Sequence, residues 1–212
     1  MIHLNTDSKI RVHYTSRARD VELIKGEALF TVQHDVVRPF SVLAGTAVII
    51  SVGSEFDVYR LSARTLVAVI QGMAEVQASD LVHNLKSGER ASIGINDQIR
   101  MDGQQEFPSA LAWEERRLDF DAATLADVAA EFNRYNRRQI VVQGSGLNSM
   151  LISGSANVDR PELLLLYVTK LRDDIVVTST DNGCMIRIKD GADIGVRKRR
   201  GSSHQSWSCS MT

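Results

Sequence analysis

Residues 26–32 read GEALFTV, and this stretch decides the fold expected for the first half of the chain. Ala28, Phe30 and Val32 recur at every second position after Gly26. A spacing of two places side chains on one face of a β-strand. We therefore predict a half-buried strand here, with these three side chains on its buried face.

The neighbouring segments repeat this β pattern. Ile10, Val12 and Tyr14 alternate with polar residues, which predicts another half-buried strand. Residues 46–52 and 65–70 are almost wholly apolar and rich in β-branched side chains, as expected of strands covered on both faces. The glycine turns between the strands recur irregularly, so a sandwich, an open barrel and an irregular solenoid all remain possible. We predict a β-rich, solenoid- or sandwich-like domain over residues 1–110.

A helical pattern begins after residue 117. Thr124 is placed to cap a helix, and Asp127 replaces the usual Glu of a capping box. The apolar residues that follow have helical spacing and form one stripe: Leu125, Val128, Ala129, Phe132 and Tyr135. Residues 139–143 and 151–158 read as strands. The chain therefore changes here from a β-rich to a mixed pattern.

A second helix is expected after Asp159, with Pro161 in its first turn and Glu162 three residues after the cap. Its predicted buried stripe is Leu163, Leu164, Tyr167, Val168 and Leu171. A closing hairpin joins residues 175–177 to 185–188 through Asp181-Asn182-Gly183, because Asn-Gly favours a tight turn. The order β-α-β-β-α-β, with one extra closing strand, predicts a small α+β domain over residues 111–190.

The segment between the two patterns, residues 101–115, contains Pro108 and a lone Trp113, and we place the domain boundary near residue 110. Trp113 is expected to pack at this junction. Residues 191–212 contain the basic run 197–200 followed by Gly, Ser, His and Gln. We predict a disordered tail there, because its apolar content is too low to offset the entropy of ordering.

Composition and motifs argue against several functions. The 212 residues carry a formal net charge of −1, so no overall field would gather nucleic acid. Neither a dinucleotide-binding glycine pattern nor a P-loop occurs, and Cys184 and Cys209 are not spaced for zinc. The five histidines show no pattern that would place a nucleophile, a base and an acid together. We therefore expect no cofactor, no metal site and no catalytic site.

Several blocks, in their order, resemble the signature blocks of the FecR family. Those of the first half are GEALFTVQHDVVRPFSV (26–42), GTAVIISVGSEFDV (45–58), VIQGMAEV (69–76) and LKSGERASI (85–93). The first block includes His34-Asp35 and Arg38-Pro39. The segment RRLDFDAATLADVAAEFNRYNRRQIVV (116–142) resembles the family's carboxy-terminal domain. That domain is similar to STN domains, the short signalling domains of secretins and TonB-dependent receptors.

The FecR family comprises single-pass inner-membrane regulators of extracytoplasmic-function (ECF) sigma factors, usually linked to iron or siderophore uptake. The resemblance therefore implies a periplasmic region that receives a signal from the signalling domain of a TonB-dependent outer-membrane receptor. The family has a cytoplasmic helical segment and a membrane span before the β domain, and the chain shows neither a span nor a signal peptide. We expect a fragment, an engineered piece or a truncated reading frame, and only the missing segment would bind the sigma factor.

We expect a protein-binding function rather than an enzyme, with docking through an exposed strand edge or a helix face of the α+β domain. The candidate residues lie on two predicted strands: Gln139, Ile140, Val141 and Val142, and Leu151, Ile152, Ser153 and Ser155. One alternative is a carbohydrate-active β-solenoid enzyme, which would need convergent carboxylates. The other is a structural interaction module of a secretin-like envelope assembly.

Overall fold

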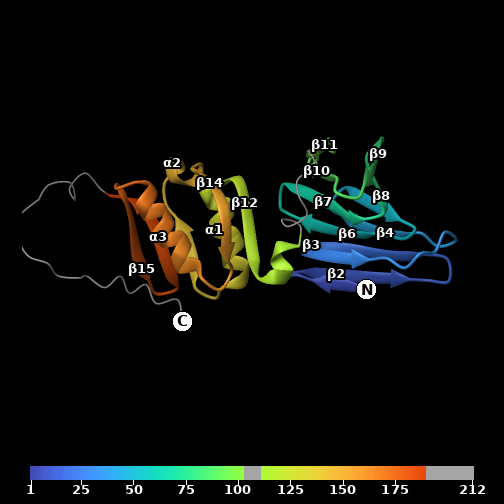
Figure 1. The fold of residues 1–212 in the computed structure, drawn as a ribbon, viewed down its shortest axis with the longest axis horizontal. Helices are drawn as coiled ribbons and strands as arrows, with labels where there is room; N and C mark the ends of the chain where they lie inside the picture. The colour runs from blue at the N-terminus through green and yellow to red at the C-terminus, as the bar shows by residue number, and fades with distance from the viewer. Residues whose placement is uncertain (103–110, 190–212) are drawn as a thin grey trace, which may run out of the picture. The chain divides into compact units, whose positions relative to one another are not determined.

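The computed structural model describes residues 1–102 and 111–189, and the chain divides into two compact units (Figure 1). Unit 1 is Met1–Glu115, and unit 2 begins at Arg116. Each unit has a hydrophobic core of its own. The boundary predicted near residue 110 and the tail predicted over residues 191–212 lie outside the described residues.

Unit 1 is built from one sheet of 11 strands in its described part. The sheet runs β11-β10-β7-β6-β3-β4-β5-β8-β9, and β1 and β2 pair with β3 beside this path. A short 3-10 helix, η2 (Ala112–Glu115), ends the unit. The strands are β1 (Ile2–Leu4), β2 (Lys9–Tyr14), β3 (Arg19–Thr31), β4 (Phe40–Ala44), β5 (Ala47–Ser51), β6 (Glu55–Arg60), β7 (Arg64–Gln71), β8 (Met73–Ala78), β9 (Leu81–Lys86), β10 (Arg90–Gly94) and β11 (Ile99–Asp102).

The long strand β3 belongs to both halves of this sheet. Residues 19–25 pair with β2 and, in part, with the parallel strand β4, whereas residues 26–31 pair with β6. The strand changes halves at Gly26, where φ is +84° and a Cβ would lie 2.3 Å from Ser8 Oγ. Both halves contribute to a single core, so the sheet has a barrel-like form. The prediction of a β-rich unit is confirmed.

The alternation in residues 26–32 is confirmed on the core side. Ala28 and Phe30 are fully buried, and the rings of Phe30 and Phe56 stack with centroids 5.3 Å apart. The strand is not half-buried, however, because Glu27 and Leu29 on its opposite face are buried too. The outer face of this part of the sheet is therefore also covered.

Two further burial predictions need correction. Val12 and Tyr14 on β2 are exposed, because β2 pairs only with β3 and lies at an edge of the sheet. On β5, Ala47 and Ile49 are buried, but the intervening Val48 is only half-buried. This strand has one core face rather than two covered faces.

Unit 2 contains two small sheets in its described part, β12-β14 and β13-β16-β15. Helix α1 contacts β12 and β13, and helix α3 contacts β14 and β15, so the two helices pack between the sheets (Figure 1). The observed order follows the predicted one, with the four-residue helix α2 added. The elements are β12 (Arg117–Thr124), α1 (Leu125–Tyr135), β13 (Gln139–Val142), α2 (Ser145–Asn148), β14 (Leu151–Asn157), α3 (Pro161–Leu171), β15 (Ile175–Thr180) and β16 (Gly183–Ile188).

The predicted start of the first helix is confirmed. Thr124 is the N-cap of α1, and its Oγ1 accepts a hydrogen bond from the backbone N–H of Asp127 at 3.1 Å. The same hydroxyl donates to the Asp127 carboxylate at 2.7 Å. Leu125, Val128 and Phe132 are fully buried, so the apolar stripe faces the core of the unit.

The second helix differs from its prediction in two ways. Its N-cap is Arg160 rather than Asp159, and Arg160 makes no side-chain cap hydrogen bond because a guanidinium has no acceptor. The Asp159 carboxylate pairs with Arg116 instead. The helix buries Leu164, Leu165 and Val168. The other members of the predicted stripe are partly exposed: Leu163, Tyr167 and Leu171.

Candidate interaction site

The two strands predicted as docking edges both lie at the edge of a sheet. β13 pairs in parallel with β16 alone, and β14 pairs antiparallel with β12 alone, within the described residues. An edge strand presents unpaired backbone N–H and C=O groups, which can accept a further strand. The two edges differ in what satisfies these groups.

The edge of β13 is capped by a side chain from α1. Asn133 Nδ2 donates to the carbonyl of Ile140 at 2.9 Å, and Asn133 Oδ1 accepts from the N–H of Ile140 at 2.7 Å. Next to it, Gln139 Nε2 donates to the carbonyls of Asn133 and Asn136. A strand added at β13 would first have to displace Asn133 from Ile140.

The edge of β14 is open. The N–H of Val158 donates to the Arg116 carbonyl, and an antiparallel ladder alternates inward-facing and outward-facing residues. Counting back by twos, Ala156 faces β12, and the backbone groups of Ser153 and Ser155 face away from it. No described residue hydrogen-bonds to these outward-facing groups. A partner strand could therefore pair here directly.

The side chains of β14 do not protect this edge. Proteins usually shield an edge strand with charges, proline or a bulge. The sequence of β14 is LISGSAN, which contains no charge and no proline. The irregularity of the pair lies on β12, between Phe120 and Ala123, where Ala122 has a φ of +47°. The Leu151 side chain is 63 % exposed at the start of the open edge.

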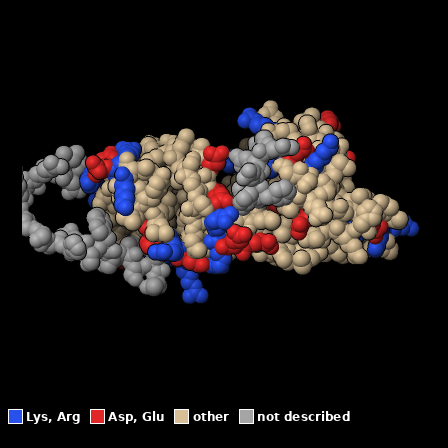
Figure 2. Space-filling model, in the orientation of Figure 1, with Lys and Arg blue, Asp and Glu red and all other residues tan. Residues whose placement is uncertain are grey.

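Helix α3, which packs against β14, has an exposed apolar face. Leu163, Leu166, Tyr167 and Leu171 on α3 are each more than 40 % exposed. Figure 2 shows that the face of unit 2 on the viewer's side is mostly uncharged. The sequence did not mark this face, because its leucines belong to the same apolar run as the leucines of the core.

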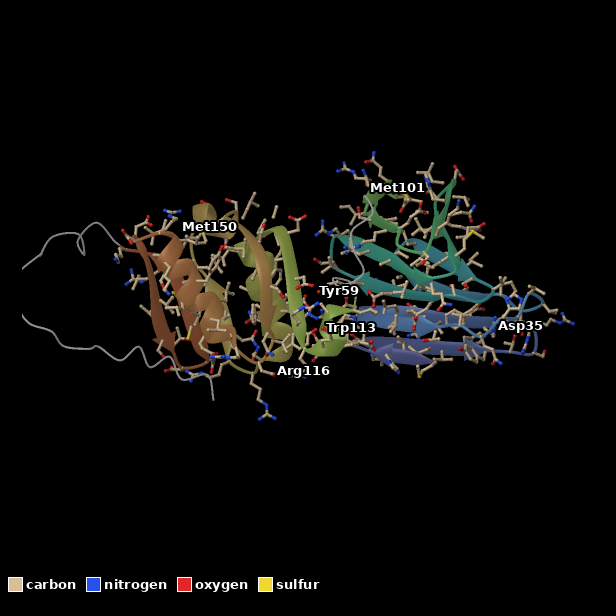
Figure 3. All side chains as sticks on the ribbon, in the orientation of Figure 1. Asp35, Tyr59, Met101, Trp113, Arg116 and Met150 are labelled. Atoms are coloured by element: carbon tan, nitrogen blue, oxygen red, sulfur yellow. The ribbon has the colours of Figure 1, made fainter. Side chains whose placement is uncertain are left out.

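The motif residues 34–39 of unit 1 form a tightly bonded loop. The Asp35 carboxylate accepts from the N–H groups of Val37 and Arg38, both at 3.0 Å, and pairs with the Arg38 guanidinium at 2.9 Å. The Arg19 side chain donates to the carbonyls of Gln33 and Arg38. Val37 at the tip is 84 % exposed. The loop lies at the end of unit 1 opposite Trp113 (Figure 3).

We predict that this loop loosens in acid. The hydrogen bond from the Arg38 N–H is the main cause that lowers the pKa of Asp35 below its ordinary value of 3.8. A lowered pKa means that the stabilisation is complete above 3.8 and is lost as the pH falls through the lowered value. In an NMR titration, the amide shifts of Val37 and Arg38 should move together below pH 3.8. Asp35→Asn should abolish that step without unfolding unit 1, and a step that survives the substitution would contradict this account.

The described residues show neither a metal-binding cluster nor a candidate membrane-spanning helix. Across residues 1–102 and 111–189, no three His, Cys, Asp or Glu side chains gather as they would around a metal ion. None of the helices in that part of the chain is both long and apolar enough to cross a membrane. The features that do favour a partner are the open β14 edge and the apolar face of α3.

Comparisons with known proteins match part of unit 1 to a family and the fold of both units to a solved structure. The family model described as FecR protein matches residues 1–75, which lie within unit 1. No curated protein matches the chain. Two crystal structures of a candidate anti-sigma factor from Parabacteroides distasonis ATCC 8503 match with a TM-score of 0.79 and 24 % sequence identity. Each match covers 89 % of this chain and 90 % of that one, so the two proteins share their fold across both units.

Proposed function

We propose that the chain is the signal-receiving, periplasmic region of a regulator of an ECF sigma factor. In this proposal, unit 2 binds the signalling domain of a TonB-dependent outer-membrane receptor and reports iron or siderophore status. The sigma factor itself would contact a cytoplasmic segment, joined to unit 1 through a single inner-membrane span. The chain acts by binding, without a catalytic step.

Two comparisons support the regulatory part of this proposal. The FecR match covers most of the strands of unit 1, from β1 into β8. The shared fold with a candidate anti-sigma factor extends through unit 2. A chain that combines this β-rich unit with a small α+β unit fits a receptor-reading regulator better than a hydrolase.

The open edge of β14 is the observation that carries the docking step. Strand addition uses backbone hydrogen bonds for affinity and side-chain pockets for specificity. The outward-facing backbone groups of Ser153 and Ser155 can supply the backbone hydrogen bonds. The exposed Leu163 and Leu166 of the neighbouring α3 can supply the apolar side-chain contacts that give specificity. β13 is the weaker candidate of the two predicted edges, because Asn133 already occupies Ile140.

A calorimetric titration tests the proposal. The full chain is titrated with the periplasmic signalling domains of TonB-dependent receptors from the same organism. We expect saturable one-to-one binding to one of them, with a negative heat-capacity change from the burial of the apolar α3 face. If the folded chain binds none of them, the receptor-docking proposal is wrong.

The same open edge favours one alternative, a structural module of a secretin-like envelope assembly. Uncharged edge strands also pair with copies of themselves. Analytical ultracentrifugation of the chain alone distinguishes the two functions. Concentration-dependent rings or oligomers that ignore receptor domains would favour the structural module, whereas a monomer that becomes a one-to-one complex would favour the receptor reader.

A further inference from the structure

The outer face of the sheet in unit 1 carries a buried row that the main core does not include. The strand registers place Leu29 opposite Asp57, Asp57 opposite Ala68, and Ala68 opposite Arg90. Residues opposite one another on neighbouring strands share a face of the sheet. Leu29, Asp57 and Ala68 are buried, although none of them belongs to the main core cluster. This face of the sheet therefore has a cover of its own.

Two carboxyl groups lie within this buried row. Asp57 is only 5 % exposed, and Glu27, two positions from Leu29 on the same face of β3, is 9 % exposed. Asn5 Nδ2 donates to Glu27 Oε2 at 2.5 Å, whereas Asp57 Oδ1 has no hydrogen-bond partner. Burial, followed by the nearby charge of Glu27, raises the pKa of Asp57 well above 3.8. Repulsion between two neighbouring buried carboxylates disfavours the state in which both Asp57 and Glu27 are charged.

The 3-10 helix η2 contributes to the cover. Ala112 is buried, and the indole N–H of Trp113 faces the Asp57 carboxyl, although it closes no hydrogen bond of normal geometry. The Glu114 carboxylate contacts His3 Nδ1 at 2.9 Å, which ties η2 to β1. Figure 3 labels Trp113 and Tyr59 at this end of unit 1. Closure thus buries two polar atoms, one on Asp57 and one on Trp113, that water could satisfy if η2 lifted away.

The charges around Asp57 oppose its ionisation. Glu27 and Glu114 add negative charge beside it, and Arg90 is the cation that acts on it directly. Within the part of the chain that the structure describes, the titratable and charged groups that face this site are Glu27 on β3, Tyr59 on β6, Arg90 on β10, Glu114 on η2 and His3 on β1. A proton on the carboxyl pair relieves the repulsion, so closure and proton uptake favour one another.

We propose that η2 is a proton-linked strap, which stays closed over the outer face of unit 1 while the Asp57–Glu27 pair holds a proton and opens when both carboxyls are charged. Arg116, the first residue of unit 2, follows η2 directly. Opening would therefore turn residues 112–115 into a linker before unit 2, with a length of about 13 Å when extended. The strap is independent of what β14 binds, and it would change the reach of unit 2 without opening either core.

The direction of the pH effect follows from linkage. The pKa of Asp57 is raised in the closed strap and returns towards its ordinary value once water reaches the carboxyl. The closed form therefore binds more protons than the open form. Closure is fully favoured below the ordinary pKa and weakens as the pH rises through the raised value. The strap should open as the solution becomes more alkaline.

Tryptophan fluorescence reads the strap directly. The chain has two tryptophans, so Trp207→Phe leaves Trp113 as the only reporter. We expect one step of red-shifted emission as the pH rises, together with faster hydrogen exchange in residues 112–115 over the same range. In Asp57→Asn on this background, the closed emission should persist through that range. A flat titration in the parent chain, or an unchanged step in Asp57→Asn, would overturn the proposal.

Two further variants separate the carboxyl pair from its neighbours. Imidazoles in general change charge between about pH 5 and 8, so His3→Gln tests whether His3 drives the step. The step should survive His3→Gln, and its loss there would overturn the proposal. Glu27→Gln should move the midpoint to lower pH, because it removes a neighbouring negative charge. If Asp57→Asn does not fold, the shift of the fluorescence midpoint in Glu27→Gln tests whether the carboxyl pair controls η2. An unmoved midpoint in folded Glu27→Gln protein would contradict the proposal.

Discussion

Replacing Gly183 by alanine should destabilise unit 2 by more than about 4 kcal/mol, which is in the range of exceptional single substitutions. Gly183 begins β16 with a φ of +155° and lies opposite Gln139 in the parallel pair with β13. A Cβ there would sit 1.9 Å from the Gln139 carbonyl oxygen, and that atom belongs to the backbone. Strand β13 would have to move away from β16. This movement would break the hydrogen bond that the Gln139 N–H donates to the Asn182 carbonyl. Hydrogen exchange at increasing urea concentration measures the free energy of unfolding of each unit separately. The free energy of unfolding of unit 1 should be unchanged.

Gly154 provides a matched control for this substitution. Its φ of +143° also disfavours alanine, but a Cβ at Gly154 would meet no atom within 4 Å. Gly154→Ala should therefore cost only backbone strain, about 1–3 kcal/mol. The difference between the two variants isolates the collision at Gln139. Equal losses in Gly183→Ala and Gly154→Ala would show that Gly183 does not approach the Gln139 backbone closely enough for a Cβ to collide with it.

The close contact of Gly183 with Gln139 could not be predicted from the local sequence. The Asn-Gly pair correctly predicted a tight hairpin, but the two turn residues are Asp181 and Asn182, and Gly183 already pairs with Thr180. Its close neighbour Gln139 lies more than forty residues earlier in the chain. Local turn preferences carry no information about a contact of this kind, so the sequence alone predicts only a turn residue at Gly183.

The core was predictable wherever local spacing alone decides burial. Alternation indicated the inward side of β3, and the helical stripe with the Thr124 cap indicated the buried face of α1. The burial of Glu27 was not predictable, because its contacts come from elsewhere in the sequence: Asn5 donates to Glu27, and Trp113 of η2 faces the neighbouring Asp57. A buried glutamate departs from the usual pattern of strand burial, and local spacing gives no sign of it.

The candidate edges were predictable only as strands. Residues 139–142 and 151–157 both have β-forming sequences, and nothing local separates an open edge from a capped one. The difference arises from Asn133, whose amide meets Ile140 because α1 packs on β13. On α3, nearly every position is apolar, so the periodicity could not assign Leu163 and Leu166 to the outer face.

Ser155→Pro should weaken binding of the receptor's signalling domain by at least about tenfold, because it removes a backbone donor from the open edge. The carbonyl of the partner strand, left buried without the donor it would have accepted from, costs roughly 1–3 kcal/mol, and 1.4 kcal/mol corresponds to a factor of ten in Kd. The substitution spares the β12 ladder, because Ser155 faces outward whereas Ala156 faces β12. Calorimetry with the cognate domain measures the change in affinity.

Ser155→Thr is the matched control, since threonine keeps the backbone N–H and favours a strand. It should bind within about threefold of the parent chain, a difference of roughly 0.7 kcal/mol. Hydrogen exchange across β12 and α1 must be the same in both variants, so that a folding defect is not read as lost binding. If Ser155→Pro is folded and binds as well as Ser155→Thr, the partner does not pair with β14. The Asn133 cap then becomes the next point to test, because removing its amide from Ile140 would open the rival edge at β13.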